Sequence, residues 1–185
     1  MASETAGNLG LTNKKIGMLI FLASEIMFFT GLLGAYMVLR HTAKTWPRVS
    51  ELVNFHLAFF STALLISSSF IFMSGLKRAQ DADIQGAKKA WKLVSVIGVL
   101  FLELQFLAWR ELASVKNIRF STNLFGAWFY ALNALHAFHL AAGIFCLIWF
   151  MSKSKSLDSF EALGLYWHFV SGVWGVIFMT LYVIG

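Results

Sequence analysis

Residues 17–40 read GMLIFLASEIMFFTGLLGAYMVLR, and this stretch decides the fold class. Its only acidic or basic residue before the terminal Arg40 is Glu25. An α-helix needs about 20 apolar residues to cross the hydrocarbon core of a bilayer. The stretch therefore predicts a transmembrane helix, which we place at residues 16–39.

Four further apolar blocks follow, separated by short segments that hold most of the charges. The chain is 58% hydrophobic and 13% charged, whereas soluble domains are typically about 45–50% apolar and about 25% charged. Helices are the expected form because the backbone must satisfy its own hydrogen bonds in lipid. We predict an all-α polytopic membrane protein, one domain over residues 1–185, with five transmembrane helices at 16–39, 55–76, 90–110, 124–150 and 160–184.

The net charge of +6 raises the question of a nucleic-acid partner. We exclude nucleic acid because the basic residues cluster at the ends of the apolar blocks, as membrane topology requires. Nine Lys and Arg fall on the side of the N-terminus and six on the other side, which predicts an N-terminus inside and a C-terminus outside. The N-terminus is polar and lacks the apolar region of a signal peptide, so we expect the first span to stay in the mature protein.

Two carboxyls lie well inside the predicted spans, those of Glu25 and Glu103. At 1.5 Å per residue both sit roughly 14–15 Å from the inner ends of their helices, near the middle of the bilayer. Ionisable groups there are costly and often functional. The functional interpretation is proton handling or binding of a polar group, and the structural one is a neutral or hydrogen-bonded carboxyl that faces another helix.

Histidines within the spans offer a second interpretation. His136 and His139 lie three residues apart in the fourth span, His168 lies in the fifth, and His56 lies near the start of the second. Histidines on facing helices can bind haem iron, which would define a bis-histidine cytochrome b. Only His136 and His168 approach matched depth, so interhelical hydrogen bonds are the favoured interpretation. The single cysteine, Cys146, predicts neither a disulfide nor a metal site.

Three stretches together resemble subunit III of the haem–copper respiratory oxidases, that is, cytochrome c oxidase and its quinol-oxidising relatives. Residues 17–40 contain the pattern SE-x-x-FF-x-G, residues 125–143 (FGAWFYALNALHAFHLAAG) contain H-x-x-H, and residues 160–174 (FEALGLYWHFVSGVW) contain FEA-x-x-x-YWHF. They occur in the family's order. Weaker similarities are Trp46–Pro47 in the first loop, residues 61–68 (STALLISS) and Gln105.

The resemblance implies a non-catalytic subunit of the short form, which lacks the first two of seven helices. Members carry no catalytic centre, haem or copper of their own. They pack beside subunit I, which holds the haem, copper and proton pathways, and we expect subunit II as a further partner. Members also hold phospholipids, keep subunit I active over many turnovers and support proton uptake in aerobic respiratory electron transport. The expected location is the inner membrane of a bacterium.

By motif match, Glu25 is the family's intramembrane carboxylate. Other residues at family positions are expected in lipid or helix contacts: His136, His139, Glu161, Tyr166, Trp167, His168 and Trp174. The chain departs from the family at Ser171 and Ala108, where many members carry Asp and Glu, and Glu103 has no assigned counterpart.

The alternatives differ in what the isolated chain would do. A subunit III of a quinol oxidase, or an accessory protein of nitric oxide reductase, would also lack cofactors. A cytochrome b would show a haem Soret band, and a small transporter using Glu25 and Glu103 would carry flux in liposomes without a partner.

Overall fold

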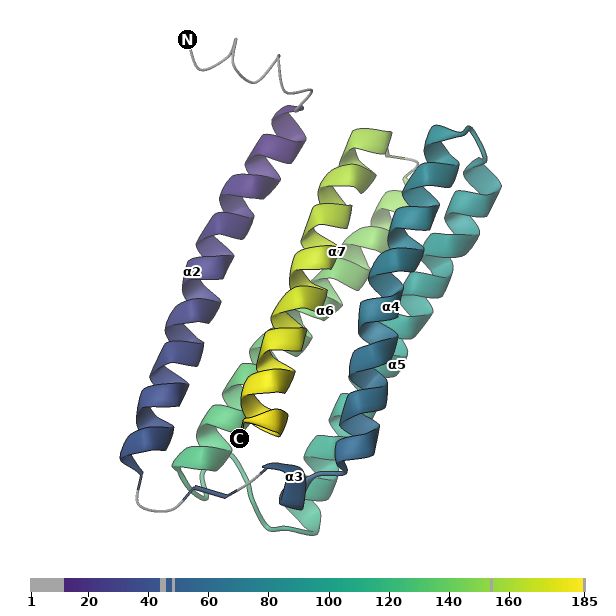
Figure 1. Ribbon diagram of the computed structural model, residues 1–185. Helices are drawn as coiled ribbons and strands as arrows, with labels where there is room; N and C mark the ends of the chain where they lie inside the picture. The colour runs from purple at the N-terminus through teal and green to yellow at the C-terminus, as the bar shows by residue number, and fades with distance from the viewer. Residues whose placement is uncertain (1–11, 44–45, 48, 154, 185) are drawn as a thin grey trace, which may run out of the picture.

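Five long helices lie side by side in a computed structural model, which describes residues 12–43, 46–47, 49–153 and 155–184 (Figure 1). Each of the five is long and apolar enough to cross a membrane. The described residues contain no strand, so the prediction of an all-α membrane bundle is confirmed. The long helices are α2 (Asn13–Thr42), α4 (Phe55–Gln80), α5 (Ile84–Ser114), α6 (Leu124–Ser152) and α7 (Leu157–Phe178); α3 (Val49–Leu52) is short, and a π-helical turn, η1 (Met179–Val183), continues α7.

The helices extend beyond the apolar spans from which they were predicted. The largest difference is at α5, which begins at Ile84 although its predicted span begins at residue 90. The added turns carry charged residues, which hydropathy excludes from a span but which a helix emerging into water readily accommodates. Three helix starts are capped by side-chain oxygens of Asn54, Asp83 and Asn123, which accept backbone N–H groups left free by the first turn.

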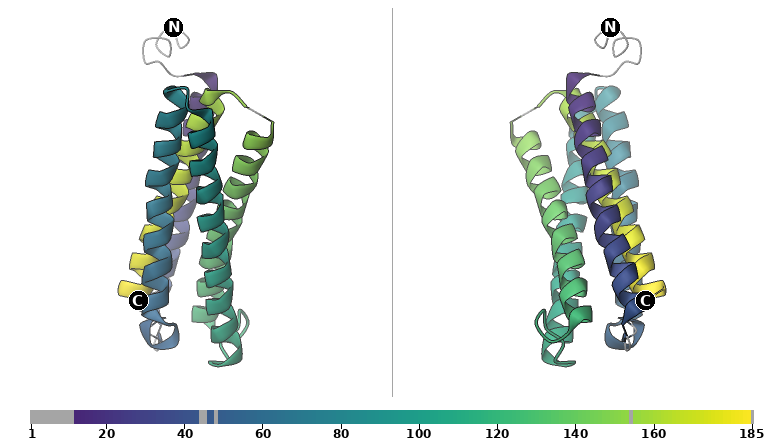
Figure 2. Two further views of the ribbon diagram at one scale, coloured as in Figure 1. Left: turned by 90° about the vertical axis from the view of Figure 1, so that its right-hand side faces the viewer. Right: turned by 90° about the vertical axis from the view of Figure 1, so that its left-hand side faces the viewer.

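Helix α7 is the central element. It packs against α2, α4 and α6, and α5 covers α4 and α6 on the other side (Figures 1 and 2). Two fully buried indoles fix α7 to α4: Trp167 donates its N–H to Ser68 Oγ at 2.9 Å, and Trp174 donates to Thr62 Oγ1 at 2.9 Å. These bonds satisfy polar groups that would otherwise be unpaired in an apolar interior.

Helix α2 lies at the edge of the bundle and packs mainly along α7 (Figure 2). Only Leu22, Phe29 and Tyr36 are buried on it, and their spacing of seven residues forms a narrow seam. The small residues of this helix are exposed instead of packed, and added side-chain carbons at its glycines would meet nothing. In α4, by contrast, Ser68 and Ser69 are buried, whereas Ser67 is exposed.

Gly75 of α4 gives a prediction about packing. A Cβ atom at this position would lie 2.6 Å from Nε1 of Trp91, whose ring is stacked on Phe160 at 4.0 Å between centroids. We expect Gly75→Ala to destabilise the bundle by about 1–3 kcal/mol, because the indole must move out of its stack. The measurement is unfolding in detergent, with Gly31→Ala as the control. Gly31 faces open space, so the control should be neutral or slightly stabilising; equal effects of the two substitutions would contradict the prediction.

Candidate functional site

Glu25 lies about halfway along α2, on the side that meets α6. Its Oε2 is 3.1 Å from Nε2 of His139, which lies 114 residues further along the chain. The two side chains are 17% and 13% exposed. The structure therefore brings together the acidic residue of the SE-x-x-FF-x-G pattern and the second histidine of the H-x-x-H pattern.

The hydrogen bonds of His139 indicate which ring nitrogen carries a hydrogen. Nδ1 of His139 lies 2.7 Å from the carbonyl oxygen of Leu135, which can only accept, so Nδ1 carries a hydrogen. Nε2 then either accepts from a protonated Glu25 or donates to an ionised one. The proton of the Glu25–His139 hydrogen bond can therefore be carried by either residue with the bond kept.

Aromatic residues hold the imidazole in place. Phe29 of α2 meets the ring of His139 edge to face, with 5.2 Å between centroids. Tyr166 of α7 donates its hydroxyl to the backbone carbonyl of His139 at 2.7 Å. Three helices, α2, α6 and α7, therefore meet at the pair, and two of its contacts come from residues that the motifs single out.

The other two histidines of the spans have different surroundings. His136 is buried against Trp174 at 4.9 Å and Phe101 at 5.9 Å between centroids, and neither ring nitrogen has a hydrogen-bond partner. His168 is half-buried and lines a groove with residues of α2 and α4. The expected interhelical hydrogen bond is therefore seen for His139 and not for His136. Within the described part of the chain, no three His, Cys, Asp or Glu side chains converge as metal ligands would.

Glu161 joins three helices at the end of the bundle where α2 begins. Its Oε2 lies 2.6 Å from Nζ of Lys15 on α2, and its Oε1 accepts from Gln80 of α4 at 3.2 Å. One residue nearer the start of α2, Lys14 donates to Ser156 and Ser159. Such pairs are worth little when fully exposed, but here they attach the peripheral α2 to the centre.

Sequence reasoning missed one polar pair. Asn133 of α6 accepts from Nε2 of Gln105 on α5 at 2.7 Å, and both side chains are buried. The signal available was a single amide residue in each of two apolar stretches, at positions that must face inward to avoid lipid. Gln105 was noted as a weak family match, whereas Asn133 was not considered.

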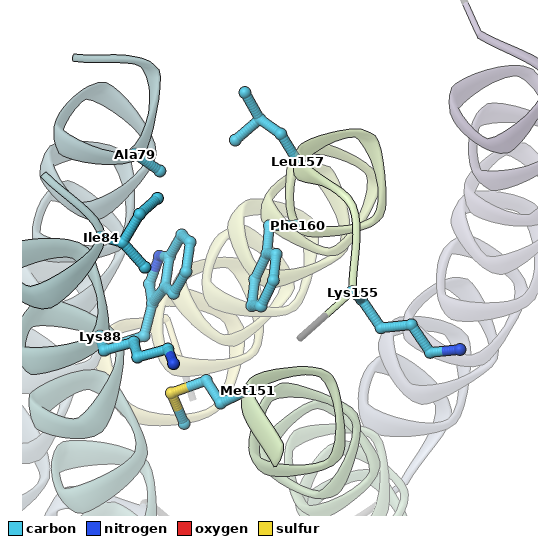
Figure 3. A pocket seen from close by; sticks show the side chains of 8 residues that line it. Ala79, Ile84, Lys88, Met151, Lys155, Leu157 and Phe160 are labelled. Carbon is cyan, nitrogen blue, oxygen red and sulfur yellow. The ribbon is translucent and has the colours of Figure 1, made fainter. Parts of the chain in front are cut away.

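A pocket of about 240 Å³ opens at the same end of the bundle as Glu161 (Figure 3). The stacked rings of Trp91 and Phe160 form one wall. Figure 3 shows the amine of Lys88 directed toward Met151, whereas that of Lys155 points away from the cavity. The remaining lining residues, Ala79, Ile84 and Leu157, are apolar.

The fold and the intramembrane pair define a polytopic helical membrane protein with an ionisable site between its spans. Over residues 5–185 the sequence matches the family model described as Cytochrome c oxidase subunit III. The chain belongs to this family, as its motifs led us to expect.

Named relatives agree along most of their length. The chain is 30% identical over 177 residues to cytochrome c oxidase subunit 3 of Thermostichus vulcanus, which covers 91% of this chain and 86% of the relative. It is 29% identical to that of a Synechocystis strain, over 92% of this chain and 76% of the relative. It is 27% identical to that of Bacillus sp. PS3, over 100% and 92%. The prediction of a non-catalytic oxidase subunit III is thereby confirmed, and the family implies membership of an oxidase complex.

Proposed function

We propose that this chain docks on subunits I and II of a haem–copper oxidase and keeps subunit I active during sustained turnover. The single observation that carries this proposal is the family match over residues 5–185. Cytochrome c is the electron donor that the relatives' names imply. A quinol-oxidising complex and a nitric oxide reductase are the alternative hosts.

We also propose a role in proton uptake by the partner, and the Glu25–His139 pair supports it. The pair lies near mid-membrane and is partly exposed at the edge of α2 and α6. A hydrogen-bonded pair in which either residue can carry the proton between them suits proton transfer to a neighbouring pathway. The redox chemistry itself belongs to the partner.

The proposed setting is the inner membrane of a bacterium, with the N-terminus cytoplasmic and the C-terminus outside. More Lys and Arg residues lie at the end of the bundle where α2 begins than at the opposite end, which supports this orientation. The Glu161 junction and the pocket of Figure 3 would then face the cytoplasm.

We propose that the chain binds phospholipid but neither haem nor copper, which belong to the partner. The pocket beside Lys88 offers apolar walls and an amine, a combination that suits an acyl chain with an acidic headgroup. A larger groove of about 700 Å³ lies between α2, α4 and α7, and its lining includes Lys15, Lys77 and His168. Its walls suit an acyl chain in the same way.

Purification of the tagged chain from native membranes tests the proposed partnership. In mild detergent we expect a larger polytopic protein to co-purify, with a haem spectrum that disappears when the chain is stripped from it. The isolated chain should show no Soret band, since its histidines do not converge. Recovery of the chain only as a self-oligomer would count against the proposal, and stoichiometric haem lost on His136→Ala would favour the cytochrome b alternative.

A further inference from the structure

Glu103 is exposed on the outer face of α5, in the middle of a membrane span. At 1.5 Å per residue it lies about 16 Å from Lys92 and about 10 Å from Arg110, the nearest basic residues along its helix. Its neighbours on that face are apolar and exposed; they are Val96, Val99, Leu100, Phe106 and Leu107, which are 44–63% exposed. We call these five residues and Glu103 the α5 stripe.

A carboxyl in this position needs a hydrogen-bond donor. Among the described residues, no side chain or backbone group bonds to Glu103, and its helix offers no cation within reach. The hydrocarbon of the bilayer has no donors. Ionisable residues inside spans almost always face a bundle interior or a polar cavity and pair there. The outward orientation of Glu103 therefore indicates that it faces the interior of a larger helix bundle, to which another chain contributes.

We propose that the α5 stripe is covered by a transmembrane helix of another protein, which presents a hydrogen-bond donor to Glu103 at mid-membrane. The donor is an Arg, Lys, His or amide side chain, because the carboxylate form only accepts hydrogen bonds. A second copy of this chain fits less well, since a two-fold contact would bring two carboxyls together, and they could bond only if at least one of them were protonated. The large side chains of the α5 stripe leave no close backbone approach, so the polar contact supplies the specificity.

This inference deepens the proposed function, because the oxidase complex is the source of the covering helix. The inference can nevertheless be tested separately from the proposed function. The Glu25–His139 pair lies between α2, α6 and α7, whereas the α5 stripe belongs to a helix that does not pack against α2 extensively. The partner's contact with the α5 stripe can therefore fail while the complex still forms through another face.

Site-specific photo-crosslinking in the purified complex locates the contact. A photoreactive phenylalanine analogue is placed at Val99 or Phe106, one turn on either side of Glu103. It is also placed at Phe138 of α6 as an exposed background position. We expect crosslinks from Val99 and Phe106 to a protein of different mass. Crosslinks only to lipid or to a second copy, in a sample that contains the haem partner, would overturn the inference but not the proposed function. Absence of any haem partner would instead overturn the proposed function.

Substitutions at Glu103 test the hydrogen bond. With the analogue at Phe106, Glu103→Leu should lower the crosslink yield roughly 3- to 18-fold, the range for an interhelical hydrogen bond in a membrane. Glu103→Gln keeps an acceptor and should retain the yield. Leucine suits a lipid-facing position, so loss of the contact cannot be assigned to misfolding. Glu111→Leu removes the same charge near the end of α5 and should leave the yield unchanged; a Glu103→Leu yield equal to that of the unsubstituted chain would overturn the inference.

Discussion

Replacing Trp167 with alanine is expected to lower the free energy of unfolding by about 3–5 kcal/mol, the usual cost of deleting a fully buried aromatic side chain. Trp167 is 1% exposed, stacks on Phe72 at 6.2 Å between centroids and donates its N–H to Ser68. The substitution leaves a cavity at the contact between α7 and α4 and removes the hydrogen bond to Ser68, whose hydroxyl still donates to the carbonyl of Leu65. Because α7 also packs against α2 and α6, the substitution should destabilise the whole bundle.

Unfolding of the purified chain in mixed micelles, titrated with a denaturing detergent, measures this loss. The matched control is Trp149→Ala on α6, where the same side chain is 44% exposed to the surroundings. The control should lower the free energy of unfolding only slightly. Removing the ring of Trp149 loses contacts with lipid and creates no cavity in the packed interior. A loss at Trp149 as large as that at Trp167 would show that α7 is not the centre of stability.

Glu25→Gln is expected to leave assembly and the first turnovers of the oxidase intact, while activity decays severalfold faster during sustained oxygen consumption. Glutamine can donate to Nε2 of His139, so the hydrogen bond between α2 and α6 survives. What is lost is the ability of the pair to exchange its proton, since an amide does not ionise. The initial rate should be unchanged because the proposed function assigns the redox centres to the partner.

An oxygen-consumption time course at several pH values, with purified complexes of equal haem content, measures the decay. Ser24→Ala is the control: Ser24 is the neighbouring exposed residue, and its hydroxyl donates only to the carbonyl of Phe21 in the same helix. Glu25→Leu separates the two roles, because it removes both the hydrogen bond and the proton. If Glu25→Gln and Ser24→Ala decay alike, with the same pH dependence, Glu25 is a structural residue.

The sequence was sufficient to predict the membrane-spanning elements. All five predicted spans lie inside helices, except that residue 184 falls just beyond η1. Hydropathy succeeds here because lipid permits only helices or closed barrels, so a long apolar block has one local solution. Hydropathy fails at helix ends such as Ile84, because the position of these ends depends on helix capping and on hydration of charged residues.

The partner of Glu25 could not be predicted in the same way. In a soluble helix the polar face shows which side points inward, but α6 is apolar on nearly every side and gives no such guide. The rotation of each helix about its axis then depends on packing between segments more than one hundred residues apart. The motifs placed Glu25 and His139 in one family pattern without showing that they touch.

The same lack of a directional signal explains two further differences. Gly31 and Gly34 are small, which is compatible with a helix contact, yet they face away from the bundle. Glu103 was expected to face another helix or to serve a function, and it faces away from the bundle of this chain. In both cases the sequence marks a surface suited to a partner helix but does not say whether that helix belongs to the same chain.

The attachment of α2 to α6 and α7 sets the order in which the chain can be completed during biosynthesis. Translation delivers α2 first, but His139 follows Glu25 by 114 residues, roughly 6–23 s later at 5–20 residues per second. Glu161 and the rest of α7 emerge later still. The first helix therefore waits in the bilayer or in the insertion machinery with its carboxyl unpaired, and its capture by the last two helices is the step that closes the bundle.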